Sequence, residues 1–187
     1  WGVARDEHHR VPVMALGAHR QAELRHFLRA SGATPYLTPD VVGGFDYRVM
    51  AGQMQAEFPG LKHVLVAGEP APGQRALAGL PDAPAPAAGS RPSDVSTTLR
   101  AGGTTSLSKL IPRTHDDYVL NARLCGAAAG FSERTVLMAI LPLGHNYNLA
   151  SPGMLGAFYF GGTVVIAQGT GVDDVFALVQ RERVTVI

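Results

Sequence analysis

A glycine-rich polar segment between two apolar runs carries the residue types that bind phosphate. It covers residues 99–115 and reads Leu-Arg-Ala-Gly-Gly-Thr-Thr-Ser-Leu-Ser-Lys-Leu-Ile-Pro-Arg-Thr-His. Glycines let backbone N–H groups converge on an anion, while hydroxyl groups and one lysine add donors and a positive charge. The candidate phosphate-binding residues are Gly102, Gly103, Thr104, Thr105, Ser106 and Lys109.

Two common phosphate motifs do not fit this segment. Lys109 is followed by Leu110 rather than by Ser or Thr, and no glycine directly precedes it, which excludes a Walker loop. No Gly-x-Gly-x-x-Gly opens a helix here, so the segment is not a dinucleotide fingerprint. On residue types alone, an ordinary solvated turn remains the alternative to phosphate binding.

A second polar group follows a predicted buried strand. The strand covers residues 135–141, and the loop of residues 142–148 lies at its carboxyl end, where ligands bind in open α/β sheets. A small-molecule site needs an apolar slot and a few polar groups that fix the orientation of the ligand, and His145, Asn146 and Ser151 could supply these polar groups. Local hydrogen bonds within a turn are the alternative role for such residues.

The elements that must position these residues alternate between strand and helix patterns. Thr114, three residues before Asp117, is a predicted N-cap of a helix that runs to about residue 130. Alternation of this kind predicts an α/β fold with a mostly parallel βαβ sheet flanked by helices. The predicted strands are 11–16, 34–37, 61–66, 95–99, 135–141 and 163–167, and the other predicted helices are 19–29, 47–58, 152–160 and 173–183.

Composition divides the chain into three segments. Residues 1–67 form a first βαβ portion, residues 68–94 are a surface loop rich in Pro, Ala and Gly, and residues 95–187 hold the phosphate loop and the second polar group. The chain begins at Trp1 without a methionine, and its last residues, 184–187, have a strand pattern. We therefore expect a piece of a longer polypeptide.

Charge and cysteine content exclude several classes of function. With a net charge of +1, the chain has no basic field for nucleic acid or an anionic membrane, and no apolar run is long enough to span a bilayer. The single cysteine, Cys125, excludes an internal disulfide and predicts a reducing compartment, the cytoplasm. The seven histidines lack metal-ligand spacing to cysteine or carboxylate, so no metal site is predicted.

Several motifs resemble one enzyme family. The run Lys-Leu-Ile-Pro-Arg-Thr-His-Asp-Asp-Tyr at residues 109–118 is similar to the 2,3-dihydroxybenzoate and salicylate AMP ligases of siderophore synthesis. These enzymes belong to the acyl-adenylate-forming superfamily, with the acyl-CoA synthetases and the adenylation domains of nonribosomal peptide synthetases. Further matches are Pro12 to Leu16, His19-Arg20, Gly44 to Tyr47, His63 to Val66, and Pro142, His145, Asn146, Tyr147, Leu149, Ser151, Pro152 and Gly153. Departures from the family pattern are Gly17, Ala101, Ser106, Ser108 and Asn148.

The resemblance implies part of the large N-terminal domain of such an enzyme, which uses ATP and Mg²⁺ and passes the acyl group to the phosphopantetheine thiol of a carrier protein. It implies two catalytic residues, Lys109 on the β- and γ-phosphates and His145 beside the carboxylate and the reacting phosphate. It also implies that Asn146 binds the 2-hydroxyl, that Tyr147 walls the ring, and that Ser151 accompanies a 3-hydroxyl, which favours 2,3-dihydroxybenzoate over salicylate.

Two alternatives stay open. The departures in the phosphate loop are compatible with a non-catalytic interaction module of the same fold. An acyl-CoA synthetase for a different carboxylic acid is the other alternative, although Asn146 and Ser151 argue against it. Because the resemblance covers only part of a family member, we expect the 187-residue chain alone to be inactive.

Overall fold

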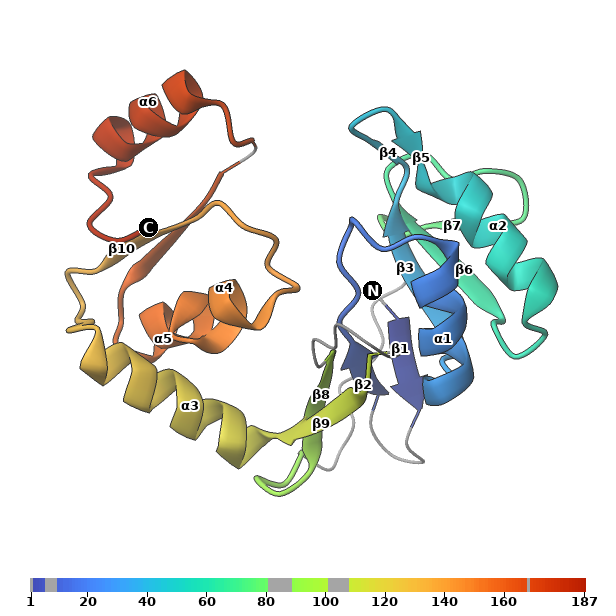
Figure 1. Ribbon diagram of the computed structural model, residues 1–187, viewed down its shortest axis with the longest axis horizontal. Coiled ribbons are helices and arrows are strands. Elements are labelled where there is room, and N and C mark those ends of the chain that lie inside the picture. The colour runs from blue at the N-terminus through green and yellow to red at the C-terminus, as the bar shows by residue number, and fades with distance from the viewer. Residues whose placement is uncertain (1, 6–9, 81–88, 101–107, 168) are drawn as a thin grey trace. The chain divides into compact units, whose positions relative to one another are not determined.

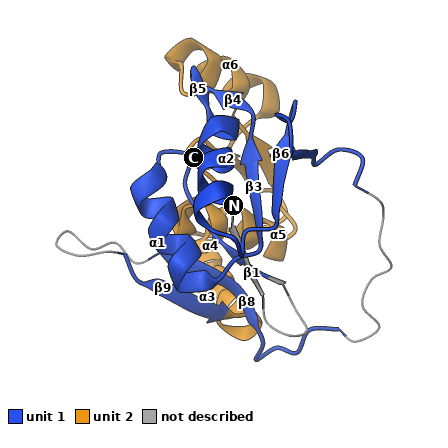
Figure 2. Cartoon of the chain, turned by 90° about the vertical axis from the view of Figure 1, so that its right-hand side faces the viewer, with its two compact units in different colours: residues 1–113 blue, residues 114–187 orange. Residues whose placement is uncertain are grey.

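The computed structural model describes residues 2–5, 10–80, 89–100, 108–167 and 169–187. The chain divides into two compact units, residues 1–113 and residues 114–187 (Figure 2). The first unit includes the phosphate-loop segment up to Arg113, and the second unit begins at Thr114, the predicted N-cap. Each unit has its own sheet and its own helices.

The first unit is built on a mixed sheet of seven strands in the order β7-β6-β3-β1-β2-β8-β9 (Figure 1). The pairs β2–β8, β3–β6 and β6–β7 are parallel, whereas β1 runs antiparallel to both of its neighbours. The α/β class expected from the sequence is therefore confirmed, with an antiparallel strand that the pattern did not reveal. The strands are β1 (Gly2–Arg5), β2 (Arg10–Val13), β3 (Pro35–Pro39), β6 (His63–Ala67), β7 (Arg75–Ala76), β8 (Val95–Arg100) and β9 (Leu110–Thr114).

Two helices and a hairpin complete the first unit. Helix α1 (Gln21–Ser31) and helix α2 (Tyr47–Glu57) lie beside the sheet, and α2 packs against β3 and β6 (Figure 1). The hairpin of β4 (Val41–Val42) and β5 (Phe45–Asp46) leads directly into α2. Apolar side chains from the sheet and both helices form one core. Its most deeply buried members, each at most 2% exposed, include Met54, Leu61, Val64 and Val66.

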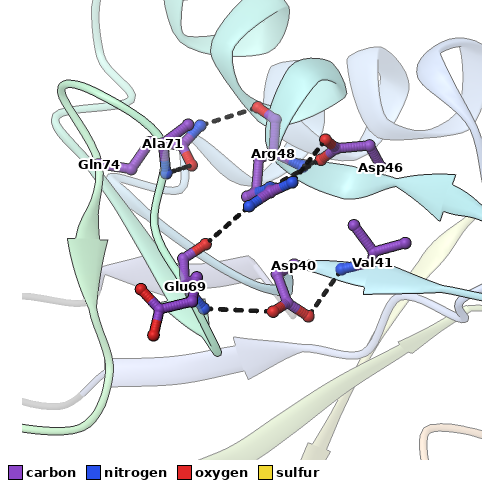
Figure 3. Close-up of polar contacts among 7 residues, drawn as sticks. All are labelled: Asp40, Val41, Asp46, Arg48, Glu69, Ala71 and Gln74. Atoms are coloured by element: carbon purple, nitrogen blue, oxygen red, sulfur yellow. Dashed lines mark hydrogen bonds and ion pairs between the residues drawn. The ribbon is translucent and has the colours of Figure 1, made fainter.

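A polar cluster ties the hairpin to the segment that follows β6 (Figure 3). Asp46 caps α2 by accepting a hydrogen bond from the Arg48 N–H (2.9 Å), and it also forms an ion pair with the Arg48 guanidinium (2.8 Å). Arg48 reaches the Glu69 carbonyl (3.2 Å), and Gln74 donates to the Arg48 carbonyl (2.8 Å). These hydrogen bonds hold the segment that connects β6 to β7, its parallel neighbour in the sheet.

The second unit contains four helices and a parallel pair of strands among its described residues. Strand β10 (Val136–Ala139) pairs with β11 (Thr163–Ile166), and Val186 adds a parallel bridge to Leu137 where a strand was expected. The N-cap prediction is confirmed because the Thr114 hydroxyl accepts from the Asp117 N–H at 3.3 Å. The helices are α3 (His115–Ala128), α4 (Asn146–Ala150), α5 (Gly153–Tyr159) and α6 (Val172–Glu182).

One local expectation was wrong in the second unit. Residues 142–148 were expected to form a loop, but helix α4 begins at Asn146. The helix forms because His145 caps it and because Leu149 donates its N–H to the His145 carbonyl at 3.0 Å. Within the part of the chain that the structure describes, no helix combines the length and the apolar character needed to cross a bilayer.

The ion pair of Asp46 predicts a measurable acid dependence of stability. The hydrogen bond from the Arg48 side chain lowers the pKa of Asp46 from 3.8 to about 2. A carboxylate with a lowered folded-state pKa stabilises the fold above its unfolded pKa, and this stabilisation is lost as the pH falls through the folded value. We expect Asp46→Asn to have a lower urea midpoint than the wild type near pH ~6, and the difference to shrink toward pH ~2 and to vanish below it.

Urea titrations of both proteins across this pH range test the expectation. Glu69→Gln is the matched control, because the contacts of Glu69 within the cluster come from its backbone. A difference between the wild type and Asp46→Asn that stays constant with pH would contradict the assignment.

Candidate active site

One face of helix α3 holds the corner between α4 and α5. The Tyr118 hydroxyl donates to Asn146 Oδ1 at 2.9 Å. Three residues further along the helix, Asn121 Nδ2 donates to the Ala150 carbonyl at 2.6 Å and to Ser151 Oγ at 3.0 Å. This spacing places both side chains on the same face of α3, the face that buries Tyr118.

Asn146 and Ser151, which the sequence suggested as ring contacts, are hydrogen bonded to each other. Asn146 Nδ2 donates to Ser151 Oγ at 2.9 Å, and both side chains are half-buried. The structure therefore brings two predicted site residues to one point. Their supporting partners Tyr118 and Asn121 were not predicted as site residues.

His145 and Tyr147 lie at the start of α4 and face solvent. The His145 Nδ1 atom accepts the Tyr147 N–H at 3.3 Å, which satisfies one of the open donors of the helix. With Nδ1 acting as an acceptor, the neutral imidazole carries its proton on Nε2 and can donate it to an oxyanion. Tyr147 is 52% exposed, so within this unit it forms an open surface rather than a closed wall.

Asn148 fixes the segment that carries these residues. Its side chain is buried, and its Nδ2 donates to the carbonyl of Leu141, just beyond the end of β10, at 2.7 Å. Proline, which the family resemblance implies at position 148, has no side-chain donor for this bond. Here a hydrogen bond from Asn148 restrains the segment between β10 and α4.

Most of the candidate phosphate-binding residues lie outside the described part of the chain, namely Gly102, Gly103, Thr104, Thr105 and Ser106. The structure describes the residues on both sides. Arg100 Nη1 donates to Ser108 Oγ at 3.4 Å, and His26 Nε2 donates to the Ser108 carbonyl at 2.6 Å. Lys109 is exposed directly before β9 and belongs to the first unit, whereas residues 145–151 belong to the second.

His19 lies near Arg100, at the start of the same segment, and has a lowered pKa. Its Nδ1 accepts the Leu16 N–H at 3.0 Å, and burial together with the charge of Arg100 lowers the pKa of its imidazole. Arg100 and Lys109 are described cations on either side of the glycine-rich residues 101–107.

The supporting residues could be suspected only from spacing. Tyr118, Asn121 and Cys125 follow one another at intervals of three and four, which places them on one helical face. His26 is 82 positions away from Ser108, so no local pattern connects them. Among the described residues, no group of three or more His, Cys, Asp or Glu side chains could hold a metal ion.

Comparison with known proteins gives consistent matches over almost the whole chain. The model of the family described as AMP-binding enzyme matches residues 6–187. The chain is 43% identical over 176 residues to a 2,3-dihydroxybenzoate-AMP ligase of Bacillus subtilis. It is 44% identical over 180 residues to a salicyl-AMP ligase / salicyl-S-ArCP synthetase of Mycobacterium tuberculosis.

Both alignments cover 94% of this chain and 32% of the relative. The apo structure of Mycobacterium smegmatis MbtA superimposes with a TM-score of 0.84 at 36% identity, covering 94% of this chain and 33% of that one. The chain thus spans about a third of the length of these relatives. The expected fold, part of the large domain of an acyl-adenylate-forming enzyme, is confirmed by this superposition.

Gly153 lies in the corner between α4 and α5, two residues after Ser151. We expect its replacement to cause a large loss of stability. Its φ of +49° is unfavourable for other residues, and an added Cβ would overlap the carbonyl group of Asn148. Gly130 has a similar φ of +69°, but a Cβ there meets nothing within 4 Å. We expect Gly130→Ala to lose ~1–2 kcal/mol from the backbone alone and Gly153→Ala to lose ~1–3 kcal/mol more from the overlap.

Urea unfolding of the two variants measures this difference directly. Equal losses would show that the carbonyl of Asn148 moves away at no cost and that the corner is not fixed.

Proposed function

Because the chain belongs to the family of AMP-binding enzymes, we propose that its protein activates an aryl acid with ATP. The observation that carries this proposal is the hydrogen-bonded pair of Asn146 and Ser151, with 2.9 Å between Nδ2 and Oγ. Two polar side chains fixed at one point are what a ligand site needs to orient an aromatic ring with hydroxyl substituents. The names of the two curated relatives, a 2,3-dihydroxybenzoate-AMP ligase and a salicyl-AMP ligase, support the same class of substrate.

The proposed reaction has two steps. A carboxylate oxygen attacks the α-phosphorus of ATP, the bond to the β-phosphate breaks, and pyrophosphate leaves, so that an aryl adenylate remains. The thiol of a phosphopantetheine carrier then attacks the acyl carbon, forms a thioester and releases AMP. In phosphoryl chemistry of this type, the protein acts mainly through positioning and charge stabilisation.

The roles of the chain's own residues follow from their chemistry. Lys109 supplies an exposed positive charge for the β- and γ-phosphates, next to the glycine-rich segment. His145 offers its Nε2–H to the oxygens of the carboxylate and the α-phosphate, because Nδ1 is already an acceptor in the helix cap. Tyr147 offers its exposed ring face to the aromatic ring of the substrate.

Mg²⁺ and location complete the proposal. The described residues contain no cluster of acidic, histidine or cysteine side chains for a metal ion, so we propose that Mg²⁺ arrives bound to the phosphates of ATP. The acceptor is proposed to be a carrier protein of siderophore or nonribosomal peptide synthesis. The single cysteine fits a cytoplasmic enzyme.

The proposal commits to 2,3-dihydroxybenzoate as the better substrate, with salicylate as the alternative. Only the former has a 3-hydroxyl for Ser151, and one hydrogen bond of ~1 kcal/mol corresponds to about fivefold in affinity. Isothermal titration of the chain with each acid, with and without ATP, should show this preference. Ser151→Cys should bring the two affinities together, because a thiol is a weak donor.

Ser132→Cys is the matched control, since Ser132 is also half-buried in the second unit but follows α3 by four residues, and its hydroxyl accepts the N–H of Arg134. Its preference should equal that of the wild type. Absence of binding by either acid, or equal binding by the wild type, would overturn the choice of substrate.

A further inference from the structure

We propose that Asn121 is a positioning residue that turns the Ser151 hydroxyl hydrogen toward the substrate, so that this position of the site only donates hydrogen bonds. The inference rests on the proposed function and adds to it the hydrogen-bond character of the ring substituent that fits. It comes from a chain of side chains on α3 and the α4–α5 corner.

The orientation of the Asn121 amide is fixed by a backbone carbonyl. The Ala150 carbonyl can only accept, so the side-chain atom 2.6 Å from it must be Nδ2 and not Oδ1. The other Nδ2 hydrogen points to Ser151 Oγ at 3.0 Å. At the opposite end of the amide, Oδ1 accepts from the Cys125 thiol at 3.9 Å, which agrees with the same orientation.

Both acceptor positions of the Ser151 hydroxyl are then occupied. One lone pair accepts from Asn121 Nδ2 and the other accepts from Asn146 Nδ2. A hydroxyl group has two lone pairs and one hydrogen, so only the hydrogen remains for a ligand. Ser151 therefore acts toward the ligand as a donor and not as an acceptor.

Asn146 has the same character. Its Oδ1 receives the Tyr118 hydroxyl at 2.9 Å, and one Nδ2 hydrogen is used on Ser151. The second Nδ2 hydrogen remains to donate. Two neighbouring groups of the site thus both present hydrogens to the ring.

This polarity selects among substituents of nearly equal size. In 2,3-dihydroxybenzoate the 2-hydroxyl donates to the carboxylate and the 3-hydroxyl donates to the 2-oxygen, so both oxygens direct lone pairs outward. In 3-amino-2-hydroxybenzoate the 3-amino group keeps one N–H that points outward and meets the Ser151 hydrogen. A donor facing a donor leaves both unpaired, and unpaired polar groups in a binding site lower the affinity for the ligand.

The test compares these two acids by isothermal titration against the wild type, Asn121→Ala and Asn121→Asp. We expect the wild type to bind the dihydroxy acid about tenfold more tightly. Asn121→Ala removes the donor, and the preference should fall to about twofold or less, because Ser151 can then rotate. Asn121→Asp can only accept, so Ser151 should donate to it and the preference should reverse.

Gln180→Glu, an exposed amide-to-acid change on α6, is the matched control and should keep the wild-type preference. A preference that is absent in the wild type, or unchanged in both Asn121 variants, would overturn the inference. The ratio of affinities is the readout, since loss of stability alone would weaken both acids together.

A second readout does not need a substrate. In a ¹⁵N-labelled chain, both Nδ2 hydrogens of Asn121 should exchange with solvent at least tenfold more slowly than those of the exposed Gln180, because both are hydrogen bonded. Equally fast exchange would overturn the inference alone. Slow exchange without binding of either acid would instead refute the proposed function, and with it the substrate that the inference names.

Discussion

The amide of Asn121 is the contact on which the candidate site depends, because it joins α3 to the backbone and to a side chain of the α4–α5 corner at once. Close packing makes this contact possible. A Cβ added to Gly126 would lie 2.6 Å from the Phe160 ring, and a Cβ added to Gly156 would lie 3.4 Å from the Ala122 carbonyl oxygen. Small residues on both helices therefore let α3 and α5 approach until short polar side chains can meet.

The elements that the sequence predicted well are those with a local physical cause. Thr114 and Asp117 define the start of α3 within four residues, and the apolar run at β10 is long enough to require burial. Strand β1 and strand β7 have no such signal, because each is short and is defined only by its partner. Helix α4 has five residues, too few for a periodic pattern, and it depends on a histidine cap that sequence rules do not favour.

The residues of the candidate site also divide into those that a local motif indicates and those that only packing brings together. Asn146 and Ser151 could be named through a resemblance to a family, since they lie five positions apart in one motif. Their partners on α3 lie 28 to 30 positions earlier, and hydrogen bonds at that separation form only when the helices pack. His26 and Ser108 present the same difficulty in the first unit, where a bond across 82 positions holds one side of the phosphate-loop segment.

These observations also bear on the departures from the family pattern. The resemblance implies a proline at positions 148 and 108. Asn148 restrains its segment through the Leu141 carbonyl, and the Ser108 hydroxyl lies 3.4 Å from Arg100 Nη1. At each position the side chain forms a hydrogen bond that proline cannot form, in place of the restraint that a proline ring puts on the backbone. Loss of the family's chemistry is therefore not a necessary consequence of either change.

The central claim is that these residues support the activation of an aryl acid. The most direct measurement replaces the matching third of the Bacillus subtilis 2,3-dihydroxybenzoate-AMP ligase with this chain and follows the exchange of labelled pyrophosphate into ATP. The account predicts exchange that requires 2,3-dihydroxybenzoate and that is lost with Lys109→Gln. A folded chimera that binds ATP but shows no exchange with either 2,3-dihydroxybenzoate or salicylate would contradict it.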